Sequence, residues 1–127
     1  MKEQILSIVK SYMEAIHTQD EKLFKSLWAD NSNVTLISIT RCFYGTDAIY
    51  QEFLIDLIQK TYESIHLIAD DIQIKKINND LAIVVFQYHT ECIKRDTLEP
   101  YGIEGLETQV LVKENDEWKI QHIHYSK

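Results

Sequence analysis

The sequence is short of the residues that mark several protein classes. Its two cysteines, Cys42 and Cys92, form no CxxC or other metal-binding spacing. They are therefore expected to be free thiols in a reducing cytoplasm, with a disulfide between them as the alternative. The opening MKEQILSIVKSYMEAIH includes acidic residues and no continuous apolar stretch, which excludes a signal peptide and a membrane span. We expect a cytoplasmic protein without a membrane partner.

Positive charge is also scarce. The chain has 13 Lys and Arg against 20 Asp and Glu, a formal net charge of −7. A phosphate backbone repels such a surface, and no basic run with interleaved aromatics offsets it, so nucleic acid is excluded as a partner. What is present is ordinary globular composition, without repeats or linkers, over 127 residues. This length predicts one domain, residues 1–127, around a single core.

Three amphipathic helices are predicted in the first half of the chain. Apolar residues recur at three- and four-residue steps over about residues 2–17. Thr18, with Glu21 three residues later, is the expected N-cap of a second helix that runs to about Trp28. The β-branched segment VTLISIT predicts a strand over 34–40. Thr46 is then the expected N-cap of a third helix that ends near Tyr62.

The second half of the chain is predicted to be strand throughout. Segments 64–77 and 81–93 flank the tight turn NND, and segments 103–114 and 117–126 flank ND as a last hairpin. The loop RDTLEPYG joins the two pairs. Helices followed by long antiparallel strands are typical of an α+β fold, with three helices on one face of a curved, mostly antiparallel sheet. Such a cone can hold a pocket at its mouth.

Strand 81–93 is apolar on both faces. Ala82, Val84 and Phe86 share one face, and Leu81, Ile83 and Val85 share the other. An antiparallel sheet covered on one side only would carry polar residues on its open side. The pattern predicts a homodimer, or a larger homo-oligomer, in which a second subunit covers the outer face.

The segment IEGLETQVLVKENDEWKIQHIHYS resembles the closing hairpin of the calcium/calmodulin-dependent protein kinase II association domain. More broadly, it resembles the SnoaL-like branch of the nuclear transport factor 2-like superfamily. The matching residues are Glu107, Thr108, Val110, Asp116, Trp118, His122, His124 and Ser126. GTDAI at 45–49 and the opening helices extend the likeness over nearly the whole chain. The resemblance implies the cone-shaped fold and dimers through the outer sheet face, but it does not choose among the isomerases, cyclases, dehydratases, kinase hubs and carriers of this superfamily.

The same resemblance weighs against two of these activities. The catalytic aspartate of ketosteroid-isomerase-like members falls on Leu36, which cannot accept a proton, although Tyr12 falls on their oxyanion-binding tyrosine. The arginines that line the kinase-hub pocket fall on Tyr88, Gln109 and Tyr125. Bidentate capture of an anion is therefore largely lost.

What remains is a predicted cavity with aromatic and hydroxyl-bearing walls. Its expected lining is Tyr12, Trp28, Phe53, Phe86, Tyr88, Gln109 and Tyr125. Such walls suit a small, mostly apolar or aromatic ligand held by a few hydrogen bonds. The alternative is that these residues are only core aromatics. Glu107, His122 and His124 are added as candidate ligand contacts.

In EWKIQHIHYS, the residues Trp118, His122 and His124 share one parity, so a regular strand places both histidines on the face of the tryptophan. A metal ion would need a third ligand, for which His89 and Glu107 are the candidates without a fixed register. We therefore predict no metal and no cofactor, and expect the histidines to form hydrogen bonds near the pocket rim or the dimer interface.

Glu107 is expected on the outer, solvated face. If it were buried, its pKa would rise and it would become a candidate general acid or base. Glu104 has the opposite parity, so the two carboxylates cannot pair on one face.

The leading hypothesis is a self-associating domain that binds an unknown small molecule without catalysis. One alternative is a SnoaL-like enzyme of the isomerase, cyclase or dehydratase type that acts on a small cyclic or aromatic metabolite. Tyr12, Glu107 or the histidines would then be its acid–base groups. A second alternative is a pure oligomerisation module with a vestigial cavity.

Overall fold

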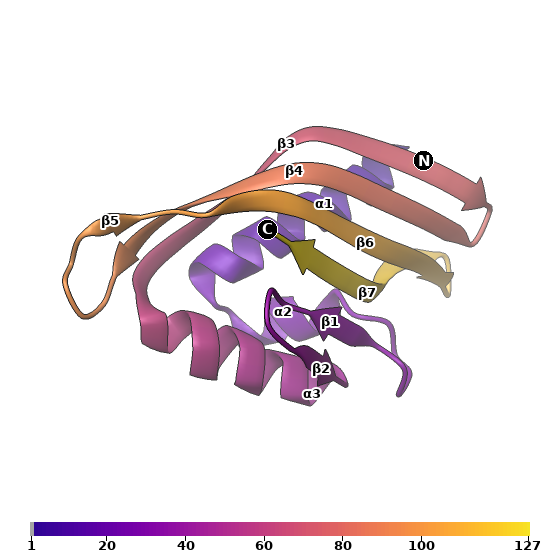
Figure 1. Ribbon diagram of the computed structural model, residues 1–127. Coiled ribbons are helices and arrows are strands. Elements are labelled where there is room, and N and C mark those ends of the chain that lie inside the picture. Colours follow the sequence, from indigo (N-terminus) through magenta and orange to yellow (C-terminus); the bar gives the residue numbers. More distant parts are fainter. Residues whose placement is uncertain (1) are drawn as a thin grey trace.

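Helices lie against the concave face of a curled sheet in the computed structural model, which describes residues 2–127 (Figure 1). The helical elements are α1 (Lys2–Thr18), α2 (Glu21–Ser26), and α3 (Thr46–Ala48), which continues into the π-helical η1 (Ile49–Gln59). The strands are β1 (Thr35–Ile37), β2 (Cys42–Tyr44), β3 (Tyr62–Asn78), β4 (Leu81–Lys94), β5 (Pro100–Tyr101), β6 (Glu104–Glu114) and β7 (Glu117–Ser126). The predicted α+β cone is confirmed.

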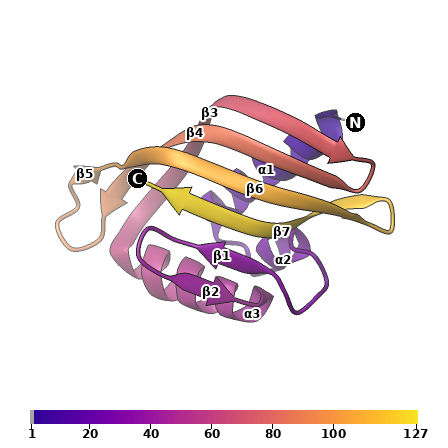
Figure 2. The same cartoon turned by 45° about the vertical axis from the view of Figure 1, so that its right-hand side comes forward.

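The strands form one mixed sheet in the order β2-β1-β7-β6-β4-β3, and β5 pairs with β4 beside this path. The pairings between these strands are antiparallel except that of β1 with β7, which is parallel and lies near the centre of Figure 2. The short strands β2 and β5 were not predicted. Cys42 on β2 and the buried Cys92 on β4 are free thiols, as predicted.

Two of the expected helix starts are wrong by one or two residues. Thr18 belongs to α1, where its hydroxyl donates to the carbonyl oxygen of Glu14, and Asp20 caps α2 by accepting a hydrogen bond from the Leu23 amide at 3.0 Å. A carboxylate fills this role as well as a hydroxyl does, because both accept a hydrogen bond. At the third helix the cap is Gly45, whose φ of +85° suits glycine, and Thr46 is already helical.

A β-bulge interrupts the β6–β7 ladder. Val110 pairs with His122, but the next residue of β6, Leu111, pairs with Ile120, so Gln121 has no partner on β6. One extra residue in one strand reverses which face the following side chains occupy. The Gln121 side chain instead exchanges hydrogen bonds with that of Asn31, in the connection before β1.

The bulge moves both histidines to the outer face. Trp118 lies inside the cone before the bulge, and Ile123 and Tyr125 lie inside after it. His122 and His124 alternate with these residues and point outward, where they are half-buried and exposed. The prediction that the histidines share the face of Trp118 is therefore wrong.

The inner face of the sheet and the helices enclose one core. On β4, Ala82, Val84 and Phe86 are buried against the helices, and the intervening Ile83 and Val85 are only half-buried on the outer face. The inner residues contribute most of the hydrophobic stabilisation, because they lose most of their contact with water on folding. None of the helices in residues 2–127 is long and apolar enough to cross a membrane.

Candidate functional site

An apolar cavity of about 200 Å³ lies between the inner face of the sheet, the end of η1 and the β1–β2 turn. Its walls are Ile16, Ser38, Ile39, Thr40, Phe53, Leu57, Ile58, Thr61, Tyr62, Ile65, Leu67, Tyr88, Thr90, Ile103 and Tyr125. None of these side chains carries a fixed charge. Ile39 and Leu57 are 45% and 42% exposed, so the cavity opens to solvent beside them through an apolar rim.

Three of the predicted ligand contacts, Phe53, Tyr88 and Tyr125, line this cavity. The aliphatic and hydroxyl walls from the β1–β2 turn and the end of η1 were missed. Segment 34–40 was predicted as one strand, whereas β1 stops at Ile37 and the next three residues turn along the cavity wall. The polar residues among these three, Ser38 and Thr40, were the available signal that the strand ends there.

Tyr125 is one of the hydroxyl-bearing residues of the cavity wall. Its ring stacks on Phe53 with centroids 5.9 Å apart, and the ring of Tyr88 meets it edge-on at 5.4 Å. Its hydroxyl oxygen lies 2.6 Å from that of Tyr12, which is fully buried on α1. Burial, reinforced by the nearby Glu107, raises the pKa of both tyrosines well above its usual value. Both are therefore neutral hydroxyl groups over the physiological pH range.

Glu107 and Gln109 lie on the inner face of β6, and both are fully buried. Glu107 pairs across the ladder with Tyr125, and the Gln109 amide Nε2 donates to Glu107 Oε2 at 2.7 Å. Burial raises the pKa of Glu107 to about 8, although hydrogen bonding by Gln109 and Tyr125 acts in the opposite direction. The expected solvated outer position of Glu107 is wrong, and the alternative of a buried carboxyl group holds.

The remaining predicted lining residues lie away from the cavity. Trp28 is buried in the core against Phe24, with ring centroids 6.0 Å apart, and Phe86 is a core residue of β4. Tyr12, Glu107 and Gln109 form a second layer behind Tyr125, because they are buried but do not line the cavity. The cavity thus has an apolar outer wall and a polar, buried support.

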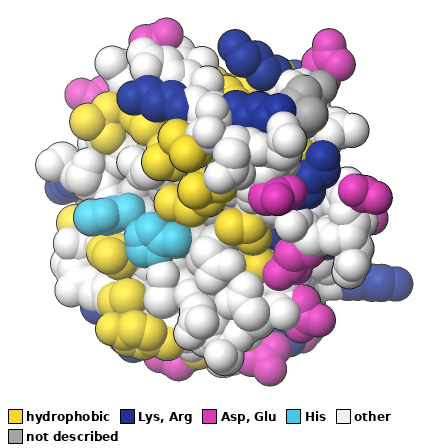
Figure 3. Space-filling view, turned by 90° about the vertical axis from the view of Figure 1, so that its right-hand side faces the viewer, with side chains coloured by type: hydrophobic (Ala, Val, Ile, Leu, Met, Phe, Trp, Pro, Cys, Tyr) yellow, Lys and Arg dark blue, Asp and Glu magenta, His cyan; other side chains and the backbone are white. Residues whose placement is uncertain are grey.

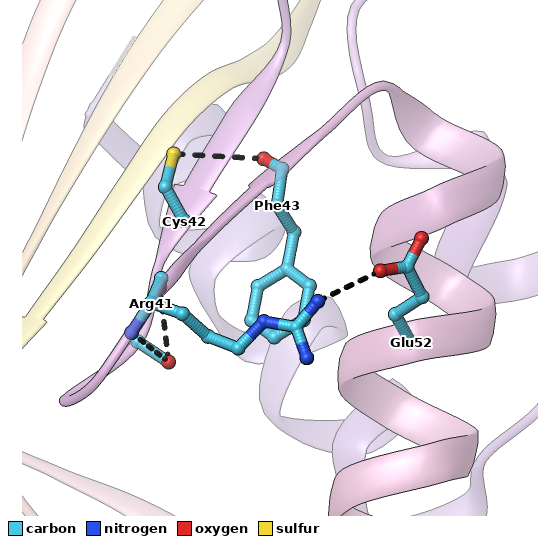
Figure 4. Close-up of polar contacts among 5 residues, drawn as sticks. Arg41, Cys42, Phe43 and Glu52 are labelled. Atoms are coloured by element: carbon cyan, nitrogen blue, oxygen red, sulfur yellow. Dashed lines mark hydrogen bonds and ion pairs between the residues drawn. The ribbon is translucent and has the colours of Figure 1, made fainter.

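An ion pair ties the cavity rim to the helix beside it (Figure 4). The guanidinium of Arg41 lies over the ring of Phe43, 4.5 Å from its centroid, and donates to Glu52 Oε1 on η1 at 2.9 Å. The hydroxyl of Ser38 donates to the Arg41 carbonyl oxygen at 3.0 Å, which closes the turn. This arginine therefore supports the wall and leaves the cavity uncharged.

The histidine pair lies outside the cavity. His122 and His124 have ring centroids 6.3 Å apart, and Nδ1 of His122 shares a short hydrogen bond with the hydroxyl of Thr35 on β1. In the space-filling view, two histidines lie side by side next to hydrophobic side chains (Figure 3). Glu107 is on the opposite face and His89 is two strands away on β4, so neither completes a metal site with the pair. Residues 2–127 contain no group of three or more side chains suited to hold a metal ion.

The model of the SnoaL-like domain matches residues 5–127. The chain belongs to the SnoaL-like domain family. No curated protein sequence matches this SnoaL-like domain. Among solved structures, it is similar to a nuclear transport factor 2-like superfamily protein from Salmonella enterica serovar Typhimurium LT2. The TM-score is 0.92 and the identity 27%, over 98% of this chain and 89% of that one.

Two further structures share the fold at low sequence identity. Hexachlorocyclohexane dehydrochlorinase LinA-type3 from Novosphingobium barchaimii LL02 has a TM-score of 0.85 at 9% identity, over 98% of this chain and 84% of that one. An uncharacterized protein with a cystatin-like fold from Caulobacter vibrioides has a TM-score of 0.81 at 14% identity, over 98% and 87%. Structures with this fold therefore include an enzyme, but at such identity the likeness extends to the fold alone.

Proposed function

We propose that this SnoaL-like domain is a self-associating protein that binds a small, uncharged, mostly apolar molecule. The observation that carries the proposal is the uncharged cavity, whose lining is apolar apart from hydroxyl-bearing side chains such as Tyr125. Placing a charged ligand there would remove its hydration without a counter-charge, which is strongly unfavourable. For a neutral, mostly apolar ligand, the free-energy cost of losing hydration in such a cavity is small.

The size of the cavity narrows the ligand class. An apolar cavity of about 150 Å³ holds one benzene molecule, and the cavity here measures about 200 Å³. A single ring with one or two substituents therefore fits. Hydroxyl-bearing side chains, Tyr125 among them, are part of the lining, so a ligand with one hydrogen-bonding oxygen fits better than a pure hydrocarbon.

Calorimetry with three one-ring probes tests this proposal. We expect phenol to bind more tightly than benzene, and benzoate to bind least, because its charge has no partner in the wall. Tyr125→Phe should reduce the difference between phenol and benzene, whereas Tyr44→Phe, on an exposed tyrosine of β2, should not. Benzoate binding as tightly as phenol would contradict the proposed ligand class.

Self-association is proposed through the outer sheet face. The outer patch consists of Thr35, Ile37, Ile83, Val85, Thr108, Val110, His122 and His124, which neighbour one another on β1, β7, β6 and β4. With neutral histidines the patch has no charge, although the chain carries −7. Two copies can therefore meet here without bringing like charges together. Light scattering at neutral pH should give a dimer or larger mass, and Val110→Asp should reduce it to the monomer mass.

Catalysis is the second candidate, and Glu107 favours it. A buried carboxyl group with a pKa of about 8, paired across the ladder with Tyr125, is poised to exchange protons near neutral pH. The test is exchange of solvent deuterium into the α-carbon of a cyclic ketone, followed by proton NMR. Exchange that is lost in Glu107→Gln supports an enzyme, and its absence over a panel of one-ring ketones supports binding alone.

A further inference from the structure

The bulge at Gln121 places two titratable side chains in the middle of the outer patch, whose other six residues are threonines, isoleucines and valines. On either side of His122 lie Thr35 of β1 and Val110 of β6. His124 lies between Ile37 of β1 and Thr108 of β6 in the same way. No neighbour on β1 or β6 is a carboxylate, so neither imidazolium has an acidic partner.

The surroundings of the pair contrast with those of His89 on the same face. Beyond the outer patch, titratable groups of this face lie on the other parts of the strands: Cys42 and Tyr44 on β2, Asp70 and Lys75 on β3, His89 and Glu91 on β4, Glu104 on β6, and Glu117 and Lys119 on β7. His89 lies 2.7 Å from Asp70, which raises the pKa of that imidazole and compensates its charge. Burial and the charge of His124 instead lower the pKa of His122, against a hydrogen bond with the Thr35 backbone.

We propose that protonation of His122 and His124 switches off self-association through the outer patch, so that the assembled form exists at neutral pH and separates in mild acid. This inference rests on the proposed self-association. A histidine covered by a second copy must stay neutral, since each subunit would otherwise bring up to two unpaired positive charges into a buried, carboxylate-free surface. The separated form binds more protons, so its share grows as the pH falls through the pKa of His122, which burial holds below its usual value.

Acid is expected to weaken association at the outer patch, which is the opposite of its effect through the net charge of the chain. The net charge is −7 with neutral histidines, so acid lowers the general repulsion between copies and by itself strengthens association. Weakening in acid therefore needs a specific source of positive charge at the contact. The outer patch supplies it only through His122 and His124.

Sedimentation equilibrium of the full chain at pH 7.5 and pH 5.5 tests the inference. We expect the dissociation constant of the wild type to rise at least tenfold in acid. In His122→Gln/His124→Gln the ratio of the two constants should fall to one or below, whatever the affinity at pH 7.5, and in the control His89→Gln it should stay as in the wild type. An NMR titration of the wild type, with both imidazoles titrating lower in the assembled than in the dilute protein, gives a reading without any substitution.

The outcomes separate the two proposals. A monomer at pH 7.5 overturns self-association and this inference with it. An assembly of equal strength at both pH values overturns the pH switch alone. A tenfold ratio that persists in His122→Gln/His124→Gln assigns the switch to other residues and overturns the role of this pair.

Discussion

The two faces of the β6–β7 hairpin carry opposite chemistry at neighbouring positions. Inside, Glu107 and Tyr125 form a buried pair of ladder partners, and burial favours the neutral, protonated carboxyl group. Outside, the adjacent residues Thr108 and His124 form the next pair, and burial favours the neutral, unprotonated imidazole of the nearby His122. The carboxyl group of Glu107 and the imidazoles therefore lie on opposite faces of the sheet, although the two ladder pairs are adjacent along the hairpin.

This separation decides which groups can act together. A carboxylate that orients a histidine must lie within hydrogen-bond reach of it, and here the backbone of the sheet stands between them. Proton transfer to the cavity would depend on Tyr125 and on the buried Glu107 behind it, without help from the histidines. The histidines are available for the proposed contact through the outer patch. Four substitutions test this division, from the largest expected effect to the smallest.

Glu107→Gln should remove the largest pH-dependent contribution to stability. The folded-state pKa of about 8 lies above the ordinary value of 4.5, so the folded protein keeps a proton that the unfolded chain releases. The stability contributed by Glu107 is therefore complete below pH 4.5 and declines by about 5 kcal/mol as the pH rises through 8. Urea unfolding from pH 4.5 to 8.5 should show this decline in the wild type and in Glu104→Gln, but not in Glu107→Gln. Parallel curves for all three would contradict the buried position of the charge.

Gly105→Ala should disturb both faces at once. A β-carbon at this position would collide with the carbonyl oxygen of Ser126, which also accepts a hydrogen bond from the Tyr88 hydroxyl at 3.1 Å. The end of β7 must then move away from β6, at a cost of about 3 kcal/mol. Gly45→Ala is the matched control, because its β-carbon meets open space and only its positive φ opposes the change, for about 1 kcal/mol. Chemical denaturation measures both, and equal losses would argue against the close approach.

Tyr12→Phe should weaken the inner face by about 1 kcal/mol, the usual net value of one hydrogen bond. The hydroxyl of Tyr125 loses its buried partner at 2.6 Å, whereas the packing of the ring is kept. Adding Tyr125→Phe should then destabilise the protein by less than Tyr125→Phe does alone, because the shared bond has already been removed. If the two losses of unfolding free energy simply add in this double-mutant cycle, the bond between the hydroxyls contributes nothing to stability.

Thr35→Val should have the smallest effect, about 0.5 kcal/mol, because its bond to His122 is only partly buried. Burial lowers the pKa of His122, and a hydrogen bond with the Thr35 backbone, which valine keeps, raises it, so this pKa should change little. NMR titration of the imidazole gives the answer, with Thr108→Val as the control on the other side of the pair. An upward shift would show that Thr35 favours the neutral ring.

The contrast between the faces could be predicted from the sequence only in part. The helical stripes and the two long hairpins follow from periodicity, and the order of elements gave the α+β cone. In β6, however, the outward-facing residues include Leu106, Val110 and Val112. This side of the strand is apolar and resembles one that faces the core. The inward-facing residues of β6 include Glu107 and Gln109. Because a carboxylate is rarely buried, the sequence alone favours the opposite orientation of the strand. Nothing local to β6 decides its orientation.

The bulge left a signal in the sequence that simple alternation overlooks. In β7 the apolar residues change parity, from Trp118 and Ile120 to Ile123 and Tyr125, and a single inserted residue reconciles the two sets. The cavity gave a weaker signal. Its walls combine a turn, the end of a π-helix and three strands, and only the folded chain brings these together.

The parallel pairing of β1 with β7 also determines when the cone can close during folding. Thr35 meets His122 across 87 residues of chain, and the hydroxyls of Tyr12 and Tyr125 meet across 113. Contacts between such distant segments form slowly, because a long loop must be ordered first, and sheets of this kind fold in roughly milliseconds to seconds. On the ribosome, β1 and the inner tyrosine of α1 emerge long before β7. Until residues 117–126 arrive, the helices have only part of a sheet to pack on, and the unpaired edges of β1 and β6 are exposed to other chains.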